Sequence, residues 1–474
     1  MNKWLGVGRL AKPLRIVTIL LLIAAGRLGN AGGQTLTVLY QLNDQTNGVS
    51  PYPGLVQGSD GDFYGTTFMG GTNEAGTVFR VSSAGTFTTL WQFNRTDGYY
   101  LVGGVAQGSD GNFYGTTANG GTNGDGTVFR ISPSGSLTTL CSFSGNSGPN
   151  PGYGPGGGLF QGSDGNFYGT TEYGGTNGGG TVFRISSAGT FTTLWQFSGT
   201  DGQYPYAGPV QGTDGYFYGT TSQGGTNGAG TVFRISSAGS LTTLWQFSGT
   251  DGRNPFAGLA QGSEGNFYGT TYGGGTNNAG TVFRISPPGT LTTLYNFGNT
   301  GSYGAGVYAG LVQGSDGNFY GATEYGGAST NCSGGCGTLF QITPSGSLTT
   351  FYSFHESDGR HPNGGLVQGY DGAFYGTTYW GGAYDDGVLF RICVPLNPPA
   401  NQISAICLAD TTVAITIPSV AGETYQLQFA ADPASGAWSN VPGVSVTNSI
   451  GSTLTFTNPA GASPQGFYRF AITP

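Results

Sequence analysis

The chain is poor in charged residues, and lysine is almost absent. Asp, Glu, Lys and Arg make up only 8% of its 474 residues, and both lysines, Lys3 and Lys12, lie near the amino terminus. Removing residues 1–31 takes away both lysines and three of the 13 arginines, which leaves ten arginines against 23 acidic residues, a net charge of −13. Nucleic acids and anionic membranes are bound through basic side chains, so we expect neither as a partner. Lysine-based Schiff-base chemistry is excluded as well.

Long apolar runs are also lacking. The longest one covers the eleven residues 16–26, follows four basic residues and precedes the small residues Gly29 and Ala31. It is too short to span about 30 Å of hydrocarbon, whereas a basic, apolar and then small pattern is typical of a secretory signal peptide. We therefore predict a signal peptide over residues 1–31, a secreted or cell-surface protein, and no membrane span after cleavage.

Histidine is limited to two residues, His355 and His361, which share one loop with Glu356 and Asp358. Such a loop could hold a metal ion or an acid–base pair. Polar histidines in a loop are more often solvated, and no nucleophile-elbow motif accompanies them. The sequence therefore predicts no catalytic triad, no metal and no cofactor.

Five cysteines in an exported chain point to disulfides rather than to thiol chemistry. Cys332 and Cys336 lie in the insertion TNCSGGCG, and Cys393 and Cys407 flank a proline-rich linker. We predict one disulfide in each of these pairs. Cys141 takes the place of a tryptophan that other repeats carry in their fourth strand, so we expect it to be buried and unpaired.

Glycine is abundant, with 93 residues, and it marks a long internal repeat. The triplet FYG recurs seven times, with Tyr at 64, 114, 168, 218, 268, 320 and 375. Repeats of about 50 residues indicate a propeller or a solenoid. Each repeat holds four short strand signals separated by turn residues, as in AGPVQG, YFYGTT, GTVFRIS and SLTTLWQF, and this is typical of a four-stranded antiparallel blade.

The two ends of the repeat region distinguish a closed ring from a linear array. The last repeat stops after GVLFRIC at residues 387–393 and lacks a fourth strand. Residues 35–42, TLTVLYQL, match the fourth strand TLTTLYNF at 290–297 almost position for position. A ring in which this strand completes the last blade leaves no open edge. We predict an all-β chain whose residues 34–395 form a seven-bladed β-propeller closed by its N-terminal strand.

The repeat resembles a known family. Its pattern, GLxQGSDGNFYGTTxxGGTNxxGTVFRISxxGxLTTLxxF, spans residues 54–393 and is similar to the GloVer tandem-repeat family of secreted bacterial proteins. The resemblance implies export, a propeller-like repeat array and a variable C-terminal anchoring segment, and it implies no particular activity. This chain ends in FYRFAITP, without an apolar helix or a sorting signal, so we do not extend the expectation of anchoring to it.

The composition changes after the linker VPLNPPAN at residues 394–401. Residues 396–474 contain alternating runs such as TVAITIP and TYQLQFA. Such runs favour a small β-sandwich of the immunoglobulin or fibronectin type.

The acid of the turn between strands one and two and an arginine of the third strand, for example Asp214 and Arg234, recur together in six repeats, while Gln341 replaces the arginine in the other. One carboxylate per turn does not make a calcium loop. We expect a structural ion pair in each blade.

Loop lengths vary only where strand four joins the next strand one and where strand two joins strand three. In an antiparallel blade both connections lie on one face, and variable loops on a rigid scaffold are where binding usually takes place. The inter-blade loops of this face carry Tyr52, Tyr99, Tyr153, Tyr204, Tyr206, Phe256 and Tyr308. The candidate ligand-binding residues follow strand two: Phe68, Tyr173, Tyr272, Tyr325, Tyr379 and Trp380. We expect at least half of all these rings to pack between blades.

These features favour a secreted or cell-surface binding protein that takes a carbohydrate or a peptide on aromatic rings. The alternative is an extracellular enzyme, a glycosidase or lyase, that uses Glu172, Glu324, Asp201 or Asp251. Glycosidic cleavage needs two carboxyl groups about 5 to 10 Å apart. The sequence leaves the ligand and the oligomeric state open.

Overall fold

The computed structural model describes residues 36–298, residues 305–394 and, further on, six strands between Ala405 and Thr473. The predicted signal peptide lies outside the described residues. Contacts group Leu36–Gly369 and Phe374–Ile392 into one compact unit, while the six later strands belong to another. The two units are described separately.

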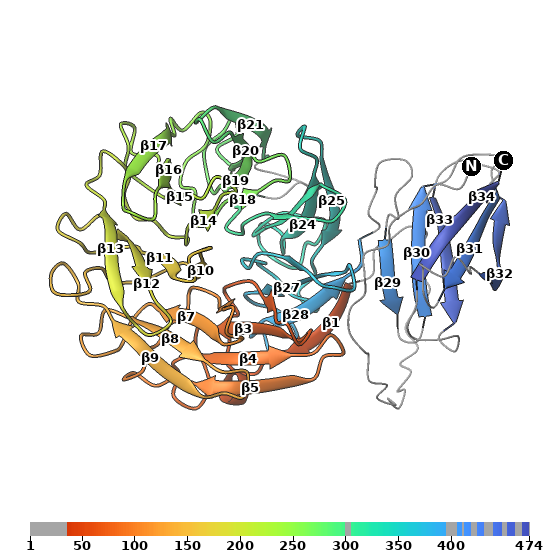
Figure 1. Ribbon diagram of the computed structural model, residues 1–474, viewed down its shortest axis with the longest axis horizontal. Helices are drawn as coiled ribbons and strands as arrows, with labels where there is room; N and C mark the ends of the chain where they lie inside the picture. The colour runs from red at the N-terminus through yellow and green to blue at the C-terminus, as the bar shows by residue number, and fades with distance from the viewer. Residues whose placement is uncertain are drawn as a thin grey trace. The chain divides into compact units, whose positions relative to one another are not determined.

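The larger unit is a ring of seven four-stranded antiparallel sheets (Figure 1). Blade 1 consists of β2 to β5, blades 2 to 6 follow in chain order, and blade 7 is the last. The first strand of each blade has two residues and lies at the inner edge of the ring: β2 (Val56–Gln57), β6 (Ala106–Gln107), β10 (Phe160–Gln161), β14 (Val210–Gln211), β18 (Ala260–Gln261), β22 (Val312–Gln313) and β26 (Val367–Gln368).

The second and third strands form the middle of each blade. The second strands are β3 (Phe63–Thr67), β7 (Phe113–Thr117), β11 (Phe167–Thr171), β15 (Phe217–Thr221), β19 (Phe267–Thr271), β23 (Phe319–Thr323) and β27 (Phe374–Thr378). The third strands are β4 (Thr77–Val81), β8 (Thr127–Ile131), β12 (Thr181–Ile185), β16 (Thr231–Ile235), β20 (Thr281–Ile285), β24 (Thr338–Ile342) and β28 (Val388–Ile392). Every residue of the second strands is buried, because neighbouring blades cover both faces of the sheet.

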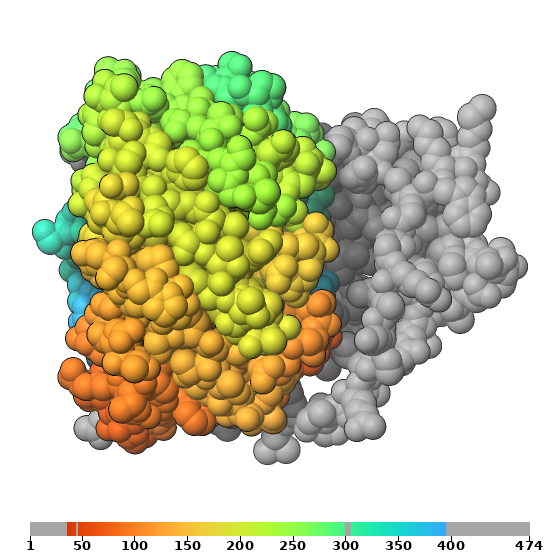
Figure 2. Space-filling view, turned by 60° about the vertical axis from the view of Figure 1, so that its left-hand side comes forward, coloured from red at the N-terminus to blue at the C-terminus, as the bar shows by residue number. Residues whose placement is uncertain are grey.

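The fourth strands form the outer wall, with blades side by side in chain order (Figure 2). They are β5 (Phe87–Gln92), β9 (Leu137–Ser142), β13 (Phe191–Gln196), β17 (Leu241–Gln246), β21 (Leu291–Asn296), β25 (Leu348–Ser353) and, in blade 7, β1 (Leu36–Gln41). A one-turn helix, α1 (Asp44–Asn47), follows β1.

The N-terminal strand closes the ring as the sequence predicts. β1 pairs antiparallel with β28, with Leu36 opposite Ile392 and Gln41 opposite Val388. The sheet order β1–β28–β27–β26 makes blade 7 a complete four-stranded sheet. Both the seven-bladed propeller and its closure by the N-terminal strand are therefore confirmed.

Neighbouring blades are joined by a repeated aromatic contact. The tyrosine of each FYG triplet lies against the first phenylalanine of the second strand in the next blade, with ring centroids 3.7–4.2 Å apart. The seven pairs are Tyr64–Phe113, Tyr114–Phe167, Tyr168–Phe217, Tyr218–Phe267, Tyr268–Phe319, Tyr320–Phe374 and Tyr375–Phe63. The last pair joins blade 7 to blade 1, so the closing interface contains the same contact as the other six.

Glycine allows the inner edges of the blades to approach each other. A Cβ on Gly208 would lie 2.0 Å from the carbonyl oxygen of Gly158 in the preceding blade, and a Cβ on Gly54 would lie 2.5 Å from that of Gly365. No side chain fits at these distances. The high glycine content is thus in part a requirement of the ring.

The expected Arg–Asp pair is wrong for most blades. The carboxylate of the turn accepts a hydrogen bond from the FYG tyrosine instead, as from the Tyr218 hydroxyl to Asp214 Oδ2 at 2.6 Å. Arg234 lies over the ring of Tyr216, 4.6 Å from its centroid. The tyrosine hydroxyl reaches the turn directly from the adjacent strand, so it takes the place that the sequence assigned to the arginine.

The cysteines of the propeller follow the prediction where they are described. Cys332 and Cys336 form a disulfide. Cys141 is a buried free thiol, and burial raises its pKa to about 12. The side chain of Cys407 lies outside the described residues, so its disulfide with Cys393 stays a prediction.

The C-terminal part forms two three-stranded antiparallel sheets. One has the order β29 (Ala405–Ala409), β30 (Thr412–Pro418) and β33 (Thr453–Pro459); the other has the order β32 (Ser439–Thr447), β31 (Thr424–Ala430) and β34 (Phe467–Thr473). The packing of a β-sandwich stays a prediction. Among the described residues, no helix has the length and apolar character that crossing a membrane requires.

Candidate functional site

We call the side of the ring that carries the inter-blade loops and the connections from strand two to strand three the loop face. One residue in each inter-blade loop has a left-handed backbone with φ of 53–67°, and its carbonyl accepts a hydrogen bond from the residue after strand two, for example from Tyr379 N to His361 O at 3.0 Å. The seven left-handed residues are Ser50, Tyr100, Gly154, Tyr204, Asn254, Gly306 and His361.

The same residues fasten each blade to the one before it. The backbone N–H of His361 donates to the carbonyl of Cys336 in blade 6 at 2.9 Å, and Ser50 N donates to Asp386 O across the ring closure at 2.9 Å. Corresponding bonds join the other blades, for example from Tyr204 N to Gly179 O at 2.9 Å. The loop face is therefore a fixed backbone frame rather than a set of free loops.

Side chains vary on this frame while the strands repeat. The second strand reads FYGTT in six blades and FYGAT in one. Two positions of the loop face, in contrast, differ widely from blade to blade. Two residues after the left-handed position stand Tyr52, Val102, Gly156, Tyr206, Phe256, Tyr308 and Asn363. Directly after strand two stand Phe68, Ala118, Glu172, Ser222, Tyr272, Glu324 and Tyr379.

Two tyrosines meet across the ring. The Tyr206 hydroxyl donates to the Tyr52 hydroxyl at 3.3 Å, although Tyr52 belongs to the loop before blade 1 and Tyr206 to the loop before blade 4. Loops of non-neighbouring blades can touch only near the axis of the ring, so this pair, which we call the tyrosine bridge, marks the centre of the loop face. The ring of Phe256 lies 5.5 Å from that of Tyr206.

The six predicted aromatic residues all lie on the loop face, but not in one cluster. Phe68 and Tyr379 flank Tyr52 with centroids at 6.4 and 5.7 Å, and Trp380 contacts Tyr379 at 4.8 Å. Tyr272 lies 4.5 Å from Tyr308, which is stacked on Phe256.

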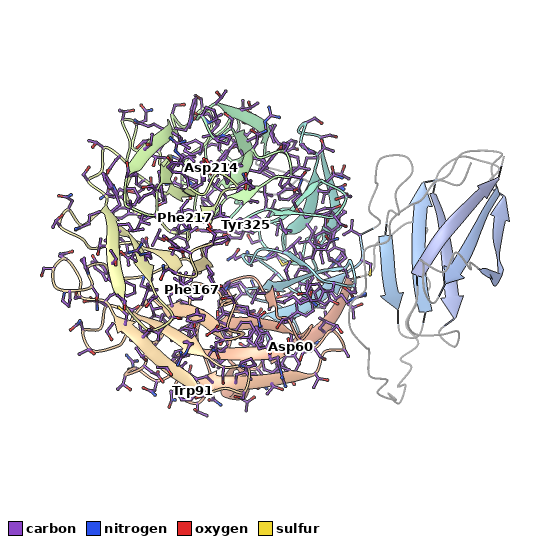
Figure 3. The ribbon with its side chains drawn as sticks, viewed as in Figure 1. Asp60, Trp91, Phe167, Asp214, Phe217 and Tyr325 are labelled. Carbon is purple, nitrogen blue, oxygen red and sulfur yellow. A yellow bond between two sulfur atoms is a disulfide. The ribbon has the colours of Figure 1, made fainter. Side chains whose placement is uncertain are left out.

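The two remaining residues belong to blades 3 and 6. Tyr173 lies between Tyr153 and Tyr204, and Tyr325 contacts His361 at 5.1 Å. Figure 3 shows Tyr325 toward the middle of the ring and Trp91 on its outer rim. All six predicted residues are half-buried, so each both packs and presents part of its ring to solvent.

Two glutamates stand near the tyrosine bridge. Burial raises the pKa of the Tyr52 hydroxyl, and the charges of Glu324 and Glu172 raise it further. Burial also raises the pKa of Glu172, and it raises the pKa of Glu324 to about 7. In each case the side chain of the following tyrosine opposes this rise. An acidic group that is half-protonated near neutral pH can both donate and accept hydrogen bonds.

Glu324 faces a histidine without forming a hydrogen bond to it. His361 Nδ1 lies 3.8 Å from Glu324 Oε1, and the side chains of the two residues are only 14% and 12% exposed. Burial lowers the pKa of His361. Glu324 Oε2, His361 Nδ1 and Asn363 Oδ1 are all buried without a hydrogen-bond partner. Leaving such atoms unpaired is costly, and a ligand with polar groups would satisfy them.

The raised pKa of Glu324 makes stability depend on pH. Between its ordinary value of 4.5 and about 7, the folded carboxyl keeps a proton that the unfolded chain has lost, so stability falls as the pH rises. Glu324→Gln removes this titration. We expect the melting temperature of the variant, relative to that of the wild type, to rise between about pH 5 and 7. Above this range the difference between the two melting temperatures should stay constant.

The effect of Glu324 can be separated from that of its neighbours. His361 has a lowered pKa and opposes this trend below its ordinary value of 6.5, but it is present in both proteins. The surrounding Tyr52, Tyr272, Tyr308 and Tyr325 have pKa values raised above 10 and do not titrate here. Differential scanning calorimetry of both proteins from pH 4 to 8 measures the effect. If the melting temperatures of the two proteins changed with pH by the same amount, the buried placement of Glu324 would be contradicted.

The two candidate catalytic aspartates have structural roles. Asp201 accepts hydrogen bonds from Trp195 Nε1 and Ser198 N, both at 2.8 Å. Asp251 does the same with Trp245 Nε1 at 2.9 Å and Ser248 N at 2.8 Å. These carboxylates fix the inter-blade loop to the fourth strand. In the part of the chain that the structure describes, no three His, Cys, Asp or Glu side chains gather into a group that could hold a metal ion.

The sequence did not identify two features of this face. The tyrosine bridge joins positions 154 residues apart, and only a ring of known blade number brings them together. His361 was expected to be solvated but is half-buried against Glu324, whereas the side chain of His355 is 55% exposed. A comparison of equivalent repeat positions would have indicated both, because these residues break an otherwise regular pattern.

Fold and loop face together define a seven-bladed β-propeller with an aromatic, acid-flanked centre. The chain belongs to the Gloeobacter/Verrucomicrobia repeat family, whose model matches residues 28–213 and 154–390. This confirms the resemblance found in the sequence.

Some solved structures are similar to this chain at low sequence identity. The extracellular domain of a protein assigned to the hybrid two-component systems of B. thetaiotaomicron is 11% identical with a TM-score of 0.48; 92% of this chain is covered, and the chain spans 57% of that domain. A periplasmic gluconolactonase of Pseudomonas aeruginosa is 17% identical with a TM-score of 0.44, over 87% of this chain and 98% of the other. No curated protein matches the chain.

Proposed function

We propose that this chain is a secreted or cell-surface binding protein that takes a neutral carbohydrate on the loop face, around the tyrosine bridge. One observation carries the proposal: the side chains that differ between nearly identical repeats gather at this one place on a fixed frame. Variation on a rigid scaffold is typical of a binding surface.

The chemistry of the face favours a sugar. Half-buried aromatic rings offer flat apolar faces, and the unpaired atoms of Glu324, His361 and Asn363 offer partners for hydroxyl groups. An anionic ligand is disfavoured because the described residues contain no lysine and because acidic residues outnumber arginines by 23 to ten after residue 31. A peptide ligand is an outcome of the test below.

Export is part of the proposal and is supported by two features. The sequence begins with the pattern of a signal peptide. The disulfide between Cys332 and Cys336 suits an oxidising compartment outside the cytoplasm.

Glycan and peptide arrays with the mature chain test the proposal, and Trp380→Ala tests the place. Trp380 is half-buried beside Tyr379, so we expect the variant to lose at least about tenfold in affinity with little loss of melting temperature. Tyr216→Ala, which removes a 39% exposed ring from the turn between β14 and β15 on the opposite face, is the matched control and should bind like the wild type.

Two outcomes would contradict the proposal. Unchanged binding by Trp380→Ala, together with a loss of stability of about 3–5 kcal/mol, would make Trp380 a core residue instead. Binding to peptides alone on the arrays would exclude a carbohydrate ligand.

A hydrolase is the second candidate, favoured by one observation. Glu172 and Glu324 both stand near the tyrosine bridge with raised pKa values, and a carboxyl group with a raised pKa can act as a general acid. Release of reducing ends from a bound glycan by the wild type, lost in Glu324→Gln, would support this function. Stable binding of the glycan without cleavage would contradict a hydrolase and support a binding protein.

A further inference from the structure

Blades 3 and 6 share three residues that no other blade combines. Each has a glycine at the left-handed position, a glutamate after strand two and a tyrosine directly after the glutamate. In blade 3 these are Gly154, Glu172 and Tyr173, and in blade 6 they are Gly306, Glu324 and Tyr325.

The backbone places the two trios in the same way. Glu172 N donates to the carbonyl of Gly154 at 3.1 Å, and Glu324 N donates to that of Gly306 at 2.9 Å. In each trio the glutamate and the tyrosine are neighbours in the chain and follow strand two directly. The carboxyl group and the aromatic ring of each trio therefore start from the same place on the loop face.

The glycines leave a gap beside each tyrosine ring. A Cβ on Gly306 would lie 3.0 Å from Tyr272 Cε2, 3.3 Å from Tyr325 Cδ2 and 3.5 Å from Glu324 Oε2, the oxygen that has no partner. A Cβ on Gly154 would lie 3.4 Å from the corresponding atom of Tyr173. The absent side chain thus leaves a small notch against the ring, and in blade 6 against the carboxyl group as well.

The next blade completes each notch with an aromatic ring at an equivalent position. Tyr204 lies 5.1 Å from the ring of Tyr173, and His361 lies 5.1 Å from the ring of Tyr325. The two notches also differ on their other side, where Tyr153 is stacked on Tyr173 at 5.2 Å and where Tyr272 lies beside Gly306.

Both notches connect to the tyrosine bridge through packed residues. A Cβ on Gly156, two residues after Gly154, would lie 3.0 Å from the carbonyl oxygen of Tyr206. Gly306 lies beside Tyr272, whose ring is linked through Tyr308 and Phe256 to that of Tyr206.

We propose that the two trios form two related sugar subsites, and that the natural ligand is a neutral oligosaccharide that reaches both across the tyrosine bridge. This inference rests on the proposed function and adds the ligand's class and minimum extent. In each subsite the tyrosine face takes the apolar face of a sugar ring, and the carboxyl group takes hydroxyl groups. Joining two sugar units in one chain makes the second contact intramolecular, which increases the affinity without any new contact.

Cello-, malto-, xylo- and manno-oligosaccharides of one to eight units, titrated calorimetrically into the mature full chain, test the inference. In an oligosaccharide series that binds, the short members should occupy two sites per protein. Longer members should bind once per protein, with at least about a tenfold gain in affinity.

Variants assign the two sites. Glu172→Gln and Glu324→Gln should each reduce the stoichiometry of short sugars from two to one and abolish the gain with length. Glu264→Gln changes the same group on the opposite face, where Glu264 accepts from the Tyr268 hydroxyl at 2.6 Å, and should bind like the wild type.

Gly154→Ala and Gly306→Ala provide a second pair of variants that fill the notches. Other blades carry Ser50 and Asn254 at the same left-handed position, so the frame accepts a side chain there. We expect these variants to lose the same subsites as the glutamate variants, with a moderate drop in melting temperature because alanine is strained at a left-handed position.

The outcomes separate the inference from the proposed function. A single site for sugars of every length, an affinity independent of length, or full binding by either glutamate variant would overturn the two subsites and leave a carbohydrate-binding protein. A wild-type protein that binds none of the four oligosaccharide series and no glycan on the array would overturn the proposed function, and this inference with it.

Discussion

A chain that begins at residue 43 should lose the cooperative unfolding of the propeller, whereas a chain that begins at residue 36 should keep it. The shorter chain lacks β1 and Leu42, a fully buried residue next to it. Removing the side chain of one such leucine costs about 2–5 kcal/mol, and losing the whole strand also leaves β28 as an open edge. We therefore expect a large drop in melting temperature and a tendency to aggregate.

Calorimetry and size-exclusion chromatography of the two chains measure this effect. The chain that begins at residue 36 is the matched control, because it differs from the other by residues 36–42 alone. A shorter chain that melts in one transition at the temperature of the control would contradict closure by β1.

Phe217→Ala should destabilise the protein by about 3–5 kcal/mol. Phe217 is 1% exposed, and its ring centroid lies 3.7 Å from that of Tyr168 in the preceding blade. The truncation removes a contact between two blades and leaves a cavity at the inner part of the ring (Figure 3). Phe63→Ala, at the interface that closes the ring, should cost a similar amount, because Phe63 is stacked on Tyr375 at 3.9 Å.

Tyr218→Phe is the control for these two variants. It keeps the aromatic ring and loses only the hydrogen bond to Asp214, so we expect a cost of about 1 kcal/mol. Chemical denaturation of the three variants gives the comparison. A Phe63→Ala variant as stable as the wild type would mean that blades 7 and 1 are not packed like the others.

The architecture could be predicted from the sequence because each repeat carries its own local signals. Glycine-containing turns and short strands of Val, Phe, Thr and Tyr recur at nearly fixed spacing, and the orphan strand at residues 35–42 has a single place in a ring. Strand formation and closure are set by these local patterns and by one pairing of edges.

The centre of the loop face could be predicted only in part. That Tyr325 and Tyr379 lie on this face follows from their position after strand two. That Tyr52 meets Tyr206 depends on the width of the ring and on how far each inter-blade loop reaches toward its axis, and neither is written in one repeat. The arginines of the third strands show the same limit, because the tyrosine of the second strand is nearer to the turn and forms the hydrogen bond to the carboxylate instead.

The most direct test of the account is a structure of the mature protein with the oligosaccharide that binds it most tightly. We predict that the sugar lies over Tyr52 and Tyr206, with Glu172 and Glu324 in contact with its hydroxyl groups. A sugar on the outer wall beside Trp195, or on the opposite face beside Tyr216, would contradict it.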